Sequence, residues 1–407
     1  MNKLSIVCFS INNWEKRRAR KQQFMLHLSK RDDVEKVLYV EPPLNLFRLL
    51  VLPFLELKTK ENQDRWKRAL TFRILPLSES QNLSIFTPVF FIPFFFKLQF
   101  IYDLNLYISF LILKYKLKRL NFNNTVLWLY HPFDYCLLKW FKNRVVSCFD
   151  WAEEWAEYFI ELPAYRRRQI LKYEDNICKG ADIIFTVSKS LLKKANRFNE
   201  HSYQIADGTV PEIFSREGQK IPEDIKPIRK PVAGYIGTVT ERFDTELLKI
   251  SAEKFPDVSF VLIGDVHYNR INISALKNMK NVYFLGGKRY EELGSYTQNF
   301  DVCILPYKCE SSLYISPTKI FDYLATGKPV VSAHLKELEG FSDLIKLARN
   351  KEQFINYLKE SLGENDPQKR KTRIEKAKEN SWSARTEEIV KILQSGLYLN
   401  CQRSQVL

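Results

Sequence analysis

The segment SPTKIFDYLATGKPVV, residues 316–331, predicts a short helix that leads directly into a buried strand. Ser316 suits the N-cap position and Pro317 the first helical position. The free N–H groups at a helix N-terminus attract anions, and Lys319 adds a positive charge in the first turn. Asp322, one turn later, can accept hydrogen bonds from hydroxyl groups. An ordinary capped helix of an α/β domain would carry the same signals, so this segment alone leaves both interpretations open.

Around this segment, apolar strands alternate with helical patterns from residue 232 onward. Strands are expected at 232–239, 258–265, 282–286, 302–307 and 329–333, with helices at 245–255, 273–278 and 290–298. Continuous apolar strands separated by helices predict a parallel sheet covered on both faces, which binds ligands at the carboxyl ends of its strands. Three amphipathic helices are expected to follow, at 351–362, 367–379 and 383–394.

The first half of the chain shows the same alternation less regularly. Strands are expected at 4–10, 34–41, 125–130, 144–150, 181–188 and 202–208, with helices at 16–29 and 163–178. A chain of 407 residues exceeds one typical core, so we expect two domains. The charged segment 215–230, which contains two prolines, is the predicted linker. The fold class is therefore α/β, with two doubly wound domains.

Glycine is unevenly distributed along the chain. All 13 glycines lie at or after Gly180. A glycine-rich loop that holds a pyrophosphate cannot form in the first 179 residues, so if the protein binds a nucleotide, the second half is expected to hold it.

Charge is uneven as well. Residues 1–205 carry 33 Lys and Arg against 20 Asp and Glu, whereas the remaining residues carry 30 against 27. A basic N-terminal half suggests an anionic partner, for which a phospholipid surface, a polyanionic glycan and nucleic acid are candidates. Nucleic acid is the least favoured, because the chain has no helix-turn-helix, zinc knuckle or RNA-recognition motif and no basic cluster with a stacking platform.

The segment Ser84–Leu120 is dense in Phe, Leu and Tyr. Polar residues interrupt it, so no run reaches the ~20 apolar residues that a membrane span needs. One interpretation is a loop followed by a core helix. The other is a membrane-facing element, whose aromatic side chains enter the bilayer surface while lysines near residue 116 meet head groups.

The cysteines favour a reducing compartment. There are seven, scattered and without a C-x-x-C pair. The apolar strand after Met1 is too short for a secretory signal, so we expect a cytoplasmic protein.

Several motifs together resemble those of the GT-B glycosyltransferases, in particular the bacterial enzymes of the teichuronic-acid type. Residues 316–331 resemble the family wording N-P-x-K-L-x-E-Y-L-A-x-G-K-P-V-V. The other matching segments are VLYVEPP (37–43), ADIIFTVS (181–188), YIGT (235–238) with RFD (242–244), and NSWSAR (380–385). They span nearly the whole chain in the family's order.

The resemblance implies a GT-B fold, with two Rossmann-like domains facing across a cleft and a C-terminal helix that crosses back to the first domain. The expected acceptor domain is 1–214, the linker 215–230, the donor domain 231–380 and the crossover helix 381–407. The implied activity transfers a sugar, with retention, from a UDP- or GDP-sugar to a glycan or lipid-linked acceptor in cell-surface polysaccharide synthesis. Peripheral contact at 84–120 would place the protein at the inner face of the plasma membrane.

The expected donor site is built without a metal ion, because the chain contains no D-x-D sequence that could hold Mg²⁺. Arg242 and Lys319 are the predicted catalytic cations, which stabilise the departing diphosphate. Asp322 matches the family's ribose-binding glutamate, while Tyr314 replaces the first glutamate of the same pattern. The predicted donor-binding residues are Gly237, Thr238, Arg242, Ser316, Pro317, Thr318, Lys319 and Asp322.

On the acceptor side, His131 and Asp150 follow or end predicted strands, where side chains point into the ligand site of a doubly wound domain. Both are predicted catalytic groups, although a satisfied loop histidine and an acidic helix start explain them equally well. The remaining predicted acceptor contacts are Trp14, Arg17, Arg20, Trp151 and Glu154.

Three alternatives remain open from the sequence. One is a catalytically inactive GT-B scaffold that binds glycan or a partner enzyme, favoured by Tyr314. Another is a nucleotide-sugar epimerase of the same fold, which needs no acceptor. The third, a nucleic-acid-binding protein, has only the basic composition in its favour. The oligomeric state, the donor base and sugar, and the acceptor cannot be read from the residues.

Overall fold

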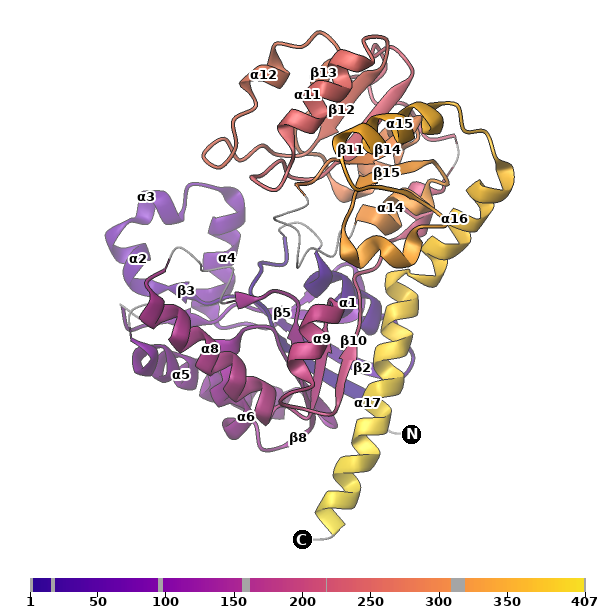
Figure 1. Ribbon diagram of the computed structural model, residues 1–407. Helices are drawn as coiled ribbons and strands as arrows, with labels where there is room; N and C mark the ends of the chain where they lie inside the picture. Colours follow the sequence, from indigo (N-terminus) through magenta and orange to yellow (C-terminus); the bar gives the residue numbers. More distant parts are fainter. Residues whose placement is uncertain are drawn as a thin grey trace. The chain divides into compact units, whose positions relative to one another are not determined.

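The computed structural model describes residues 3–15, 19–93, 98–155, 162–216, 218–308 and 319–405 (Figure 1). The chain divides into two compact units. Unit 1 comprises residues 1–206 and 386–407, and unit 2 comprises residues 207–385. Each unit has its own buried apolar cluster.

Unit 1 contains an eight-stranded sheet in the order β10-β9-β8-β7-β1-β2-β5-β4. Neighbouring strands are parallel except β4, which runs antiparallel to β5. The strands are β1 (Leu4–Phe9), β2 (Val34–Val40), β4 (Leu75–Leu77), β5 (Ser80–Phe86), β7 (Thr125–Leu129), β8 (Arg144–Trp151), β9 (Ile183–Thr186) and β10 (Ser202–Gln204). The strand order reverses between β1 and β7, so their carboxyl ends flank the position where such sheets bind ligands.

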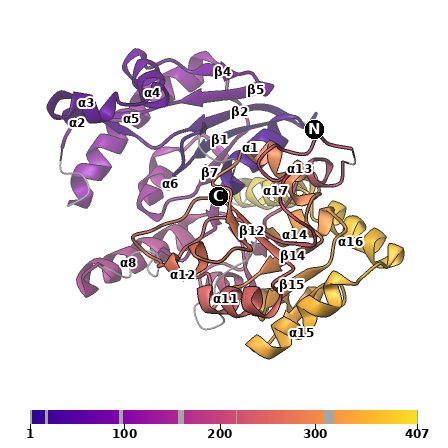
Figure 2. The same ribbon diagram turned by 90° about the horizontal axis from the view of Figure 1, so that it is seen from above.

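A small parallel ribbon of β3 (Leu44–Asn45) and β6 (Val89–Phe90) extends unit 1 beyond the sheet. The helices of unit 1 are α1 (Arg20–Ser29), α2 (Leu46–Val51), α3 (Pro53–Glu56), α4 (Lys60–Thr71), α5 (Gln99–Arg119), η1 (Pro132–Cys136), α6 (Leu137–Trp140), α8 (Ala164–Gly180) and α9 (Lys189–Ala195). Helices α2, α3 and α4 lie together at one end of the unit in both views (Figures 1 and 2).

Unit 2 contains a six-stranded parallel sheet in the order β13-β12-β11-β14-β15-β16. The strands are β11 (Val232–Ile236), β12 (Ser259–Ile263), β13 (Val282–Phe284), β14 (Val302–Leu305), β15 (Val330–Ala333) and β16 (Lys346–Ala348). Strands β11, β14 and β15 are buried along their whole length, as expected where helices cover both faces. Here the strand order reverses between β11 and β14.

The helices of unit 2 begin at the capping residues that the sequence offers. Asp244 accepts a hydrogen bond from the N–H of Leu247 at the start of α11, and Asn350 caps α15 in the same way. The helices are α10 (Pro211–Phe214), α11 (Thr245–Lys254), α12 (Ser274–Lys277), η2 (Tyr290–Glu292), α13 (Leu293–Thr297), α14 (Lys319–Ala325), η4 (Lys336–Phe341), α15 (Lys351–Leu362) and α16 (Pro367–Glu379).

Helix α17 (Trp382–Gln405) starts in unit 2, and its residues from 386 onward belong to unit 1. Ile389, Val390 and Leu393 are buried. A side chain at Gly396 would meet Ile183 of β9, which shows how closely the helix approaches the sheet of unit 1.

The structure confirms the strand and helix pattern expected in unit 2 and adds β16, which was not expected. The division between the units differs from the expected linker at 215–230. It lies at Ala206/Asp207, and Ile225 is buried in the core of unit 2. Within the described part of the chain, none of the helices is long and apolar enough to cross a membrane.

Candidate functional site

The loops after β11 and β14 meet at the point where the strand order of unit 2 reverses. The N–H of Asp244 donates to the carbonyl of Pro306 at 2.8 Å, and the N–H of Lys308 donates to the carbonyl of Arg242 at 2.9 Å. These backbone bonds fix the residues that follow both strands side by side. The loop after β11 therefore holds its position at the expected ligand-binding edge of the sheet.

Gly237, directly after β11, has φ +140°, a conformation that L side chains rarely adopt. A Cβ placed there would lie 2.0 Å from Cε and 2.8 Å from Nζ of Lys319, the first residue of α14. The structure thus brings together two predicted donor-site residues that are 82 positions apart. Glycine is favoured here by its φ, and it also lets the Lys319 side chain lie directly against the backbone.

Two tyrosines hold the Lys319 ammonium group. Nζ donates a hydrogen bond of 2.9 Å to the hydroxyl of Tyr307, and it lies 5.7 Å from the ring centre of Tyr235. Burial alone would raise the pKa of Tyr307, but the Lys319 charge, the hydrogen bonds from Lys319 and Tyr235 and the charge of Arg242 together outweigh it, and the pKa is lowered. The result is a positively charged group held in a fixed place at the sheet edge.

Arg242 is exposed in the loop after β11, and its charge also acts to lower the pKa of Tyr307. Thr238, in the same loop, accepts a hydrogen bond from the Tyr235 hydroxyl through its carbonyl oxygen. The predicted residues Gly237, Thr238, Arg242 and Lys319 therefore form one group around Tyr307, which we call the Lys319 cluster. Such a cluster can bind an anion.

Asp322, one turn along α14, is buried. Its Oδ1 accepts hydrogen bonds from the hydroxyls of Thr209 (2.6 Å) and Tyr290 (3.0 Å). Burial raises its pKa to about 7, although both hydrogen bonds act in the opposite direction. Among the described residues no hydrogen bond to Oδ2 is found, so that oxygen is the atom through which Asp322 would contact a ligand hydroxyl.

Four residues discussed for the donor side lie outside the described residues, and so does one for the acceptor side. They are Tyr314, Ser316, Pro317, Thr318 and Arg17.

Most of the described acceptor-side residues of unit 1 are engaged in contacts inside the unit. Asp150 is completely buried, and its Oδ1 lies 2.9 Å from NH2 and 3.0 Å from Nε of Arg20. Arg20 also donates to the carbonyl of Ile205. The two charges therefore neutralise each other inside unit 1, which favours a structural role for this pair over the predicted contacts with substrate.

The other predicted acceptor contacts are engaged within the fold in the same way. Trp14 is buried, and its backbone N–H and ring Nε1 donate to Glu41 and Glu79. Trp151 is fully buried at the end of β8, and Glu154 forms an ion pair of 2.9 Å with Lys194. These contacts inside unit 1 occupy the three side chains, so their predicted contacts with the acceptor stay a prediction.

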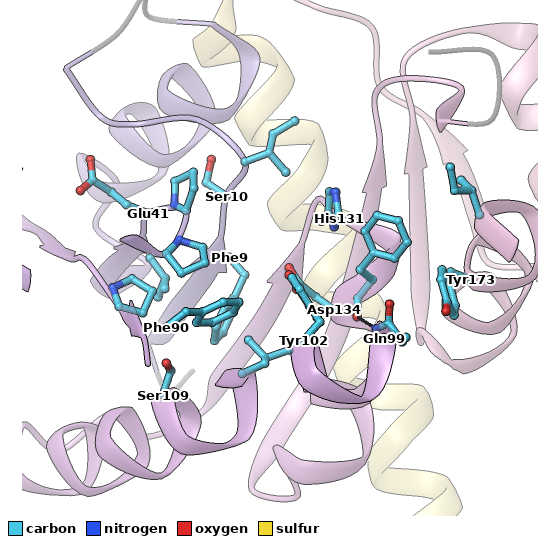
Figure 3. Close-up of a pocket in the computed structure, with 18 of the residues that line it drawn as sticks. Phe9, Ser10, Glu41, Phe90, Gln99, Tyr102, Ser109, His131, Asp134 and Tyr173 are labelled. Atoms are coloured by element: carbon cyan, nitrogen blue, oxygen red, sulfur yellow. Dashed lines mark hydrogen bonds between the residues drawn. The ribbon is translucent and has the colours of Figure 1, made fainter. Parts of the chain in front are cut away.

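His131, by contrast, lines a cavity of about 620 Å³ in unit 1 (Figure 3). Its ring lies 4.6 Å from that of Phe133 and 4.8 Å from that of Trp155. Burial, and then the charge of Lys21, lower the pKa of His131 to about 3. The imidazole is therefore neutral at physiological pH, where it can accept or donate a hydrogen bond.

Sequence reasoning missed several residues of these sites. Tyr307 ends the strand expected at 302–307, so its position at the sheet edge could have been noticed. Asp134 and Tyr102 share a 2.6 Å hydrogen bond beside the cavity, but they come from segments 32 residues apart. No local pattern reveals such a pair.

Comparison with known families identifies residues 230–363 as a match to "Glycosyl transferases group 1". A protein of Bacillus subtilis (strain 168) named for teichuronic acid biosynthesis, the glycosyltransferase TuaH, is 31% identical over 183 residues. This alignment covers 43% of the chain and 46% of TuaH, so it spans about half the length of that relative.

Solved structures resemble the chain over nearly its full length. Sucrose-phosphate synthase of Thermosynechococcus elongatus has a TM-score of 0.65 at 14% identity, covering 97% of this chain and 99% of the other. HepE of Anabaena, solved with UDP and glucose, has a TM-score of 0.61 at 13% identity, covering 97% and 100%. These likenesses confirm the expected fold. The chain has the GT-B fold, and its residues 230–363 match the group 1 glycosyltransferases.

Proposed function

We propose that the protein is a glycosyltransferase that moves a sugar from a nucleotide sugar to a glycan or lipid-linked acceptor, with retention of configuration and without a metal ion. The observation that carries this proposal is the Lys319 cluster at the sheet reversal point of unit 2. The match of residues 230–363 to a glycosyltransferase family supports the reaction class. The family resemblance supports retention.

The transfer reaction requires, above all, that the negative charge on the departing diphosphate is stabilised. The bond between the sugar's C1 and the phosphate oxygen breaks, the acceptor oxygen bonds to C1, and the acceptor hydroxyl releases its proton. Negative charge grows on the departing diphosphate. Lys319 and Arg242 are placed to neutralise that charge, and preorganised cations of this kind commonly contribute 10²-fold or more.

The donor is proposed to be a UDP-sugar, with a GDP-sugar as the alternative. Structures of HepE were solved with UDP and UDP-glucose, which supports uracil as the first base to test. The buried Asp322 is proposed to receive a ribose hydroxyl through Oδ2. The name of TuaH supports an acceptor that belongs to a cell-surface polysaccharide.

Unit 1 is proposed to contact the inner face of the plasma membrane from the cytoplasm. Helix α5, which forms the second part of the expected element 84–120, has exposed apolar side chains at helical spacing on its outer side. Helices α2 and α3 add more. We call the following set the apolar outer surface: Leu50, Val51, Phe54, Leu55, Phe100, Leu104, Tyr107, Leu111 and Tyr115. Exposed apolar groups in a basic region are typical of interfacial proteins.

The test is to assay transfer and donor hydrolysis by Lys319→Ala and Arg242→Ala with a panel of nucleotide sugars. Each variant should lower kcat/KM by about 10²-fold, because it removes charge stabilisation from the transition state. Lys249→Ala is the matched control, since this lysine lies on α11 in the same unit, partly exposed and paired with Glu253. It should retain full activity.

Wild-type kinetics in both variants would remove the Lys319 cluster from the mechanism. Activity should also persist in EDTA, and its loss and recovery with Mg²⁺ would contradict the metal-free proposal. If no sugar nucleotide is bound, transferred or hydrolysed, the inactive scaffold becomes the better description.

A further inference from the structure

The cavity beside His131 lies at the ligand-binding edge of the unit 1 sheet. Its walls come from the carboxyl ends of β1, β2 and β7, from α5 on one side and from α8 on the other (Figure 3). The strand order reverses between β1 and β7, where doubly wound sheets bind their ligands. A volume of about 620 Å³ falls in the range of small-molecule sites. Nothing in the Lys319 cluster belongs to this cavity.

The surface of the cavity is mainly hydrocarbon. Aromatic and aliphatic side chains from strands and helices of unit 1, together with three prolines, form most of it. The apolar members used in this argument are Phe9, Phe86, Phe90, Leu106, Leu113 and Ile170. All six are buried to the level of a protein core, with exposures of 0–7%.

Most polar groups in the walls have partners inside unit 1, whereas Nδ1 of His131 is buried without a hydrogen bond to the described residues. Glu41 accepts hydrogen bonds from the Thr87 hydroxyl and the Trp14 N–H, and Ser109 donates to the carbonyl of Val89. Asp134 accepts from Tyr102. A sugar, which must pair many hydroxyls, would find few free partners here, and unpaired hydroxyls are costly to bury.

The cavity is also poor in charge. Burial raises the pKa of Asp134 to about 7 and lowers that of His131 to about 3, so both are uncharged near pH 6. The Glu41 carboxylate also lines the cavity, but it is paired with two arginines of α4. Among the described lining residues the positive charge comes from Arg166, which is half-buried in the first turn of α8. A ligand that fits these walls has a long apolar part and a group, neutral or negatively charged, that can lie beside Arg166.

Helix α5 connects this cavity to the apolar outer surface. Leu106, Ser109 and Leu113 of the helix line the cavity, while Leu104 and Leu111 on the other side of the same helix are nearly half exposed. A helix that is apolar on both sides separates a hydrocarbon-lined cavity from a surface suited to lipid.

We infer that this cavity holds the hydrocarbon chain of an anionic amphiphile, which is the acceptor's lipid part. The inference rests on the proposed function, because it names the class of acceptor. The chain fills the space between α5, α8 and the sheet, and Arg166 meets the acidic head group. The acceptor is then a lipid-linked molecule and not a free glycan.

The experiment measures binding of cis-parinaric acid, a fluorescent anionic amphiphile, to the full-length protein without nucleotide. Ser109→Phe places a phenyl group in the cavity and should weaken binding at least about tenfold. Leu104→Phe, on the outer side of the same helix, should leave it unchanged. Leu106→Ala, which enlarges the cavity, should keep binding, so it remains informative if Ser109→Phe does not fold.

Dodecyl phosphate should compete with the probe, and glucose should not. Failure of the wild-type protein to bind the probe, equal binding by Ser109→Phe and wild type, or competition by glucose would each overturn the inference. The proposed function is read separately, from the thermal shift that UDP produces in unit 2. Probe binding without a UDP shift would count against the donor site alone, and a UDP shift without probe binding against the cavity alone.

Discussion

The buried ion pair of Arg20 and Asp150 shows which properties of single residues can be predicted from the sequence and which cannot. Both attracted attention because they follow or end predicted strands, and that placement was correct. Their partnership, across 130 positions, has no signature in the local sequence. Lys319 is the opposite case, because its position at the start of a capped helix suggested an anion site, and the structure places it beside Gly237. The position of a residue can be predicted when it depends on its neighbours in sequence, as for Lys319. It cannot be predicted when it depends on a partner far away in the sequence, as for Arg20.

Arg20→Ala is predicted to destabilise unit 1 by about 3–5 kcal/mol, because it leaves the buried Asp150 carboxylate unpaired. Urea unfolding followed by tryptophan fluorescence measures this change. The double variant Arg20→Met with Asp150→Leu should recover much of the loss. Normal stability combined with loss of activity in Arg20→Ala would restore the predicted role in acceptor binding.

Asp134 predicts a pH dependence of stability. Its pKa is raised from 3.8 to about 7, so the protonated form is favoured in the folded state and stability is lost as the pH rises from about 4 to about 7. Asp134→Asn keeps an acceptor for Tyr102 and removes the titration. As the pH rises through that window, the free energy of unfolding of the variant should increase relative to that of wild type by on the order of 1 kcal/mol per pH unit. Parallel curves of unfolding free energy against pH would contradict this.

At the scale of elements, alternation of apolar strands with helices was sufficient to predict unit 2, because each element carries its own periodicity and caps. Unit 1 was harder. Strand β5 and helices α2 to α4 were not anticipated. Asn45 and Thr59 do cap α2 and α4, but α2 and α3 are only six and four residues long, too short to show a helical period. Helix α5 was expected only as one of two interpretations. Its apolar residues surround the helix, so the pattern could not show which side is buried.

The exposed side chains of α2 and α3 predict binding to anionic vesicles. Phe54 is 92% exposed and Leu50 72%, the most exposed of the apolar outer surface. Replacing both with Glu should weaken co-sedimentation with phosphatidylglycerol vesicles at least tenfold, since burial of each apolar side chain is worth about 1.5–3 kcal/mol.

Tyr268→Glu, which alters an exposed aromatic residue of unit 2, is the control and should bind vesicles like wild type. Unchanged sedimentation of the double variant would exclude α2 and α3 from the contact. If the double variant loses a dimer that the wild-type protein forms, and vesicle binding is unchanged, the same surface is an interface between two copies of the chain.

At the scale of the whole molecule, glycine distribution and charge indicated two different halves before any element was assigned. The structure divides the chain into two units with separate cores, although not at the expected linker. The charged composition of 215–230 suggested a connector, but buried Ile225 anchors this segment in unit 2. The composition of a segment indicates how exposed its residues are on average. It cannot show that one side chain of the segment is buried in a core.

Two cores predict two unfolding transitions, of which UDP shifts one. At 100 times its dissociation constant a ligand stabilises its unit by about 2.7 kcal/mol. Six of the seven tryptophans lie in residues 1–206 and Trp382 lies in unit 2. Calorimetry should therefore show a shifted transition that tryptophan fluorescence largely misses. An equal shift by both methods would indicate that the chain unfolds as one cooperative body.

The return of α17 to unit 1 has a consequence for how the protein is made. Ile389, Val390 and Leu393 bury themselves in unit 1, yet about 180 residues of unit 2 leave the ribosome before them. At typical elongation rates the nascent first unit waits roughly 10 to 40 s with an uncovered apolar strip. During that interval chaperones can bind the uncovered strip. If a ribosome stalls within unit 2, the released fragment contains residues 1–206 of unit 1 but lacks the α17 residues that complete this unit.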